Sequence, residues 1–116
     1  MASVKATELS DKGIVILEPK GNFVGGDETD DLRDSIKKYS ESGNKKLIID
    51  LGDVLYLNST ALGVLISAHA NYSKREGKIK LCQLNKNLEN LFVITKLALI
   101  FDSYPTKEDA IKSFEQ

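Results

Sequence analysis

The chain has 116 residues, of which 41% are hydrophobic, and its 16 basic and 17 acidic side chains leave a formal net charge of −1. This length suffices for one domain over residues 1–116 with a single apolar core, and the dispersed charges exclude the broad cationic surface that nucleic acids require. The longest apolar run, residues 97–101, is far shorter than the ~20 residues that span a bilayer, and the N-terminus lacks the apolar core of a signal peptide, so we expect no membrane association.

The N-terminal part of the chain predicts a β-hairpin. Two segments rich in apolar residues, 4–9 and 13–18, flank a short polar turn. Pro19 and Gly21 are expected to limit the second strand, because proline lacks a backbone donor and glycine weakens strands. A short edge strand at residues 23–24 is compatible with the pattern before the chain enters its first helix.

Residues 27–42 predict an amphipathic helix. Its apolar stripe consists of Leu32, Ile36 and Tyr39, and Gly43 follows as a stop. The acidic side chains of its first turns suit the positive end of the helix dipole. These are Asp27, Glu28, Asp30 and Asp31.

The centre of the chain predicts a buried strand that leads through a polar turn into a second helix. Residues 47–49 form a continuous apolar run that suits a strand covered on both faces, and Asp50 closes it. Residues 54–57 are expected to return the chain to the interior. The polar residues 58–60 then precede a helix that runs to about Arg75, which places Ser59 at a helix N-terminus.

The remaining elements alternate between strand and helix. Residues 79–84 predict a strand, and either Asn85 or Asn87 can cap a third helix. A last short strand is expected at residues 100–101, followed by a closing helix at residues 107–114. The inward side chains of the third helix are expected to be Leu88, Leu91, Phe92 and either Thr95 or Ile94.

A hairpin followed by repeated helix–strand units favours parallel pairing across the crossovers. We therefore predict an α/β fold, with a mixed sheet of four to five strands covered by about four helices.

The sequence offers little for catalysis, metal binding or a cofactor, and we expect none of the three. His69 is the only histidine and has no acid or nucleophile arranged with it. Cys82 is the only cysteine, which indicates a structural thiol in a reducing cytoplasm. The glycines of residues 21–26 lack both the GxGxxG spacing and the Lys-Ser/Thr ending of a phosphate loop.

Ser59 has two interpretations from the residues alone. Serine and asparagine at a strand-to-helix junction commonly accept a hydrogen bond from the first helical turn, which would make Ser59 a helix cap. Alternatively, Ser59 is a functional hydroxyl displayed at the helix start.

The segment around Ser59 resembles the signature of STAS domains, and specifically of bacterial anti-sigma factor antagonists. In that signature an apolar strand, an acidic residue, an aromatic residue and a serine precede Leu-Gly. The matching residues here are Asp50, Leu51, Val54, Tyr56, Leu57, Ser59, Leu62 and Gly63. The resemblance covers most of the chain and implies a single STAS domain.

The resemblance implies a binding protein, not an enzyme. It would bind an anti-sigma factor that is also a serine kinase, and so free a sigma factor. Phosphorylation of Ser59 would switch binding off, and a serine phosphatase is a further candidate partner. Partner-binding residues would be Asn58, Ser59, Thr60, Ala61 and Leu62. Val54, Tyr56 and Leu57 would set the turn from inside, and Gly63 would permit close helix packing.

Three residues depart from the usual antagonist pattern. Antagonists commonly have Asp before the serine and a small residue such as Ser, then Gly, after it, where this chain has Asn58, Thr60 and Ala61. The acidic residue that often follows a glycine in the loop before the first helix is not matched after Gly21. A scaffold or accessory subunit of a signalling or transport complex, without phosphorylation, is the alternative, and the oligomeric state is left open.

Overall fold

The structure is a computed structural model that describes residues 3–115. Its elements in chain order are β1 (Ser3–Leu9), β2 (Ile14–Phe23), α1 (Asp27–Glu41), β3 (Lys46–Asp50), β4 (Val54–Leu57), α2 (Ser59–Lys74), β5 (Lys78–Cys82), α3 (Lys86–Ile94), the 3-10 helix η1 (Leu97–Leu99), β6 (Asp102–Tyr104) and α4 (Lys107–Ser113).

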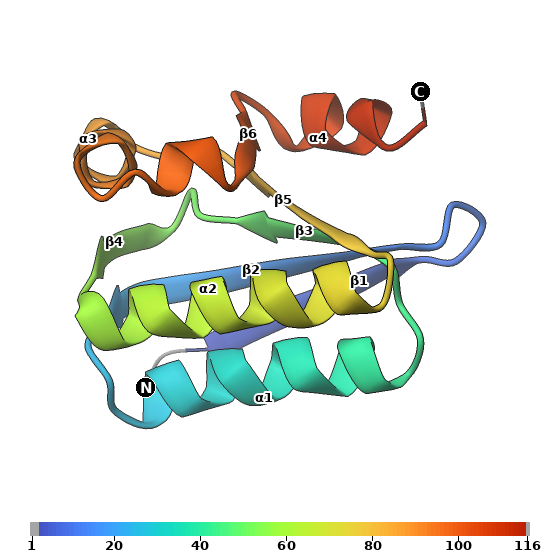
Figure 1. The fold of residues 1–116 in the computed structure, drawn as a ribbon, viewed down its shortest axis with the longest axis horizontal. Helices are drawn as coiled ribbons and strands as arrows, with labels where there is room; N and C mark the ends of the chain where they lie inside the picture. The colour runs from blue at the N-terminus through green and yellow to red at the C-terminus, as the bar shows by residue number, and fades with distance from the viewer. Residues whose placement is uncertain (1–2, 116) are drawn as a thin grey trace.

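The strands form one mixed sheet with helices on both faces, as the sequence predicted. Within the described residues the sheet has six strands, one more than expected: five in the order β1-β2-β3-β5-β6, and β4, which pairs with β2. Among the strands of residues 3–115, β1 and β2 pair antiparallel and the other pairs are parallel. Helices α1 and α2 lie side by side on one face of the sheet, and α4 lies on the other (Figure 1).

The expectation that Pro19 and Gly21 limit the second strand is wrong, since β2 continues to Phe23. Pairing between β2 and β3 ends at Leu17, so at Pro19 the strand has only β1 beside it. The missing N–H of Pro19 therefore removes no hydrogen bond to β3. Gly21 has φ +111°, and the register with β4 shifts between Gly21 and Asn22. The glycine therefore bends the strand away from β3 toward β4 instead of ending it.

The central strands are buried on both faces, which explains their continuous apolar sequence. In β3, Ile49 packs into the larger core under α1 and α2, while Ile48 packs into the smaller core under α4. In β5, Leu81 packs into the larger core and Cys82 into the smaller core. Neighbouring residues of these strands therefore point to opposite faces of the sheet.

Two expectations for the C-terminal third are wrong. Ile94 is 79% exposed and Thr95 is also exposed, so neither lies inward on α3. The last strand was expected at residues 100–101, but it is β6, at Asp102–Tyr104. Lys96 has a left-handed backbone with φ 65°, and the short helix η1 that follows turns the buried Phe101 onto Phe92 of α3.

Candidate functional site

The loops that follow β2 and β4 lie together, because these strands are parallel neighbours. Phe23 pairs with Leu57 at the strand ends, and the N–H of Asn58 donates to the carbonyl of Phe23 at 3.0 Å. Beyond the strands, a Cβ on Gly25 would lie 3.3 Å from the Cβ of Thr60. The turn around Ser59 is therefore packed directly against the glycine loop that enters α1.

Asn58, and not Ser59, is the N-cap of α2. The Oδ1 of Asn58 accepts from the N–H of Ala61 at 3.0 Å, and its carbonyl accepts from the N–H of Leu62 at 2.9 Å. Ser59 is the first helical residue and is exposed, and its hydroxyl makes no hydrogen bond within the part of the chain that the structure describes. The interpretation of Ser59 as the cap is therefore wrong.

The helix start leaves donors available beside this hydroxyl. The backbone N–H groups of Ser59 and Thr60 have no partner among residues 3–115, as is usual for the first turn of a helix. Free N–H groups and the positive end of the helix dipole favour an anion at this place.

Asn58→Ala is expected to lower the free energy of unfolding by ~1 kcal/mol, because it removes the acceptor of the Ala61 N–H. The matched control is Ser59→Ala, which removes an unbonded hydroxyl and should change it by less than ~0.5 kcal/mol. Urea denaturation followed by circular dichroism measures both variants. Equal losses in the two variants would contradict the cap assignment.

The surroundings of Ser59 differ from the predicted set in two ways. Ala61 and Leu62 are 0% and 8% exposed, so their side chains face the core and offer little surface to a partner. Tyr56 was expected to set the turn from inside, but it is 53% exposed. In β4 only the two end residues, Val54 and Leu57, are buried. Because all four residues of this strand are apolar, the sequence does not show which of them are exposed.

Glu28 organises the loop on the other side of the site, a role that sequence reasoning missed. Its Oε2 accepts from the Thr29 hydroxyl at 2.7 Å, from the N–H of Val24 at 2.8 Å and from the N–H of Gly26 at 2.9 Å. The hydrogen bond from Thr29, followed by those from the two backbone donors, lowers the pKa of the Glu28 carboxyl to about 2. Gly25 lies between these two backbone donors and has a positive φ of +88°, which turns the chain there.

Acidification is expected to open this loop. Because the folded pKa of Glu28 is about 2 and its ordinary value is 4.5, its stabilising contribution is present above pH 4.5 and is lost as the pH falls toward 2. A carboxyl-detected NMR titration should give this low pKa. The variant Glu28→Gln should remove the pH dependence of the Val24 and Gly26 amide signals, and persistence of that dependence would contradict the assignment.

The histidine and the cysteine have structural positions. His69 meets the ring of Phe101 edge-on, with centroids 5.3 Å apart. Cys82 is 0% exposed, and burial raises the pKa of its thiol to about 12. Residues 3–115 contain no group of three or more His, Cys, Asp or Glu side chains that could hold a metal ion. No helix in that same range is long and apolar enough to cross a membrane.

Comparison with known proteins identifies the family. The family profile described as STAS domain matches residues 8–110, which is most of the chain. The chain belongs to the STAS domain family. The matched part of this STAS domain includes both the Glu28 loop and the Ser59 turn.

Relatives of this STAS domain carry names from one regulatory class. An anti-sigma-B factor antagonist of Bacillus subtilis (strain 168) is 36% identical over 81 residues, which are 70% of this chain and 73% of the relative. The protein of the same name from Listeria monocytogenes serovar 1/2a (strain EGD-e) is 32% identical over 71 residues, or 61% of this chain and 62% of the relative.

Solved structures share the fold over nearly the whole STAS domain. An anti-sigma factor antagonist from Mycobacterium paratuberculosis superposes with a TM-score of 0.84 at 21% identity, covering 100% of this chain and 96% of its own. The phosphorylated form of the Bacillus cell fate determinant SpoIIAA gives 0.75 at 14% identity, covering 96% and 98%. At these identities the similarity establishes the architecture.

Proposed function

We propose that this STAS domain, acting as one domain, is an anti-sigma factor antagonist in the cytoplasm. The unmodified domain binds an anti-sigma factor that is also a serine kinase, and this binding frees a sigma factor. Phosphorylation of Ser59 by that kinase switches binding off, and a serine phosphatase restores it. The names of the relatives support the antagonist function and a regulatory binding role rather than an enzymatic one.

One observation supports Ser59 as the switch more than any other. Its hydroxyl is exposed at the first position of α2, where the neighbouring N–H groups are unpaired within the described chain. A phosphate there would meet these donors and the positive end of the helix dipole, so the folded domain should tolerate it.

The surface around Ser59 explains why a partner would not tolerate the phosphate. Val24, directly after β2, is 52% exposed, and Tyr56, in β4, is 53% exposed. A phosphate adds about −1.5 to −2 charge at neutral pH, and burying it against an apolar interface costs desolvation. The proposed contact surface therefore comprises Asn58, Ser59 and Thr60 with these two apolar neighbours, and no longer includes the buried Ala61 and Leu62.

Affinity capture from the source cells tests the proposal. The tagged chain should retrieve a serine kinase in the absence of ATP and release it when ATP is added, and mass spectrometry should identify the kinase as an anti-sigma factor. A stable complex that is indifferent to ATP would contradict the switch and favour the scaffold alternative. Ser59→Ala should keep the kinase bound in the presence of ATP, because the phosphate acceptor is gone.

A further inference from the structure

Gly63 in α2 has no packing reason within the described chain. It was expected to permit close helix packing, but a Cβ built on it would have no atom within 4 Å. Glycine is less favourable than alanine in the interior of a helix, because it loses more backbone entropy on folding. The bare backbone at Gly63 therefore leaves open space on the surface of α2.

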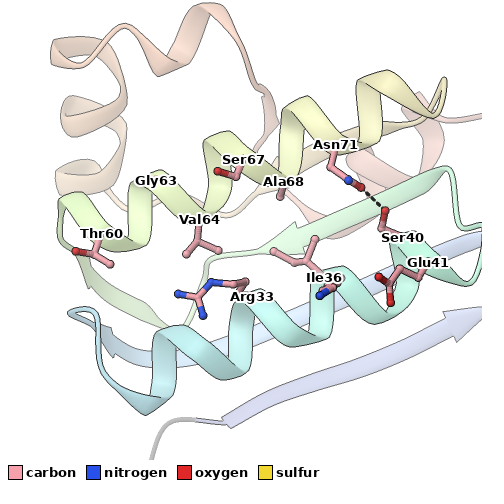
Figure 2. Close-up of a pocket in the computed structure, with 11 residues that line it drawn as sticks. Arg33, Ile36, Ser40, Glu41, Thr60, Gly63, Val64, Ser67, Ala68 and Asn71 are labelled. Atoms are coloured by element: carbon pink, nitrogen blue, oxygen red, sulfur yellow. Dashed lines mark hydrogen bonds between the residues drawn. The ribbon is translucent and has the colours of Figure 1, made fainter.

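That space is part of a groove between α1 and α2 with a volume of about 480 Å³. Its floor is formed by Gly63, Val64 and Ile36, and it begins at Thr60, the residue after Ser59 (Figure 2). At the far end, a hydrogen bond between Ser40 and Asn71 bridges the two helices (Figure 2). The groove is thus apolar at its base and continuous with the proposed contact surface.

The α1 side of the groove carries two cations, Arg33 and Lys37, and one carboxylate, Glu41, which lies beside Ser40 at the far end (Figure 2). Arg33 pairs with Asp30 at 2.8 Å, and both of these side chains are about half exposed. Lys37, one turn further along α1, makes no ion pair with residues 3–115. Exposed pairs of this kind are weak and exchange readily with a better placed carboxylate.

We infer that this groove receives a segment of the anti-sigma factor that carries an apolar side chain over Gly63 and a carboxylate between Arg33 and Lys37. The inference rests on the proposed function and specifies how the partner is held. Complementary charge favours an acidic segment, and the missing Cβ provides room for its apolar side chain. A phosphate on Ser59 would lie at the mouth of the groove, where it repels the acidic segment.

A side chain at position 63 tests the inference. The probe is the anti-sigma factor kinase recovered by affinity capture and then purified, with binding measured by calorimetry. Gly63→Leu should weaken binding by about tenfold or more, because leucine fills the groove. The control Ala70→Leu adds the same side chain at an exposed position of α2 outside the groove and should change binding by less than about twofold. Circular dichroism and a melting temperature no lower than that of the parent should show that Gly63→Leu is folded.

Charge reversal tests the acidic character of the segment. Lys37→Glu and Arg33→Glu should each weaken binding by about tenfold, and the effect should shrink as salt is raised. The control Lys38→Glu reverses an exposed charge on α1 outside the groove and should leave binding within about twofold.

The outcomes separate this inference from the proposed function. Equal binding by the parent and Gly63→Leu would overturn the groove inference and leave the antagonist function standing. If no anti-sigma factor binds the parent chain, the proposed function fails and the inference fails with it. If Gly63→Leu instead abolishes self-association in sedimentation and leaves kinase binding unchanged, the occupant is a second copy of this chain and the inference is overturned.

Discussion

Phosphoserine at position 59 is expected to weaken binding of the anti-sigma factor by about a hundredfold relative to the unmodified chain. This corresponds to ~3 kcal/mol, the order of the cost of desolvating a doubly charged group beside apolar surface. Val24, directly after β2, and Tyr56, in β4, supply that exposed apolar surface. The measurement is calorimetry with the purified kinase, using phosphoserine incorporated at Ser59 during synthesis so that the modification is complete.

The control for this experiment is phosphoserine at Ser73, an exposed residue near the C-terminal end of the same helix. It adds the same charge about four turns away from Ser59 and should change the affinity by less than about threefold. Similar weakening at both positions would show that net charge alone, and not the Ser59 surface, controls binding. Ser59→Ala should bind as tightly as the unmodified chain.

Leu65→Ala is expected to lower the free energy of unfolding by about 2–5 kcal/mol, because it leaves a cavity in the larger core. Leu65 is 0% exposed and lies on the side of α2 that packs against the sheet. Equilibrium unfolding in urea measures the loss, and the slope of the transition should stay close to that of the parent.

Ile66→Ala is the matched comparison, since the next residue of the same helix is 42% exposed. The expected loss is less than ~1 kcal/mol, because the side chain already contacts solvent. If the two variants were equally unstable, α2 would be buried on both sides, which would contradict the surface assigned to it.

The order and class of the elements could be predicted because the hydrophobic pattern reports burial directly. The apolar run at residues 47–49 indicated a strand covered on both faces, and Ile48 and Ile49 do pack into the two separate cores. The helix over residues 27–42 was predicted to within a residue at its C-terminus, since its apolar stripe and Gly43 define it together.

What could not be predicted depends on contacts between distant segments or on backbone conformation. Gly21 bends β2 toward β4, although the sequence predicted that it would limit the strand. The hydrogen bonds of Glu28 depend on the positive φ of Gly25, which the sequence permits without requiring. Gly63 was expected to permit close helix packing. The position of α1 in the structure shows instead that the space beside Gly63 is open.

The sequence predicted that Ser59 lies at the start of a helix, but it did not predict which of the surrounding residues are exposed. Ser59 does begin α2, yet Asn58 supplies the cap and the buried Ala61 drops out of the contact surface. The exposed Tyr56 enters it instead, because β4 buries only its end residues. A sequence pattern of consecutive apolar residues does not distinguish the two sides of so short a strand.

Phosphopeptide mapping of this chain from its own cells shows whether Ser59 is a phosphorylation switch. The chain would be isolated during growth and under stress, and its bound proteins would be identified from the same sample. We expect phosphate on Ser59 in the fraction without the kinase, and unmodified Ser59 in the fraction that carries it. Unmodified Ser59 under every condition, together with a stably bound partner, would contradict the switch.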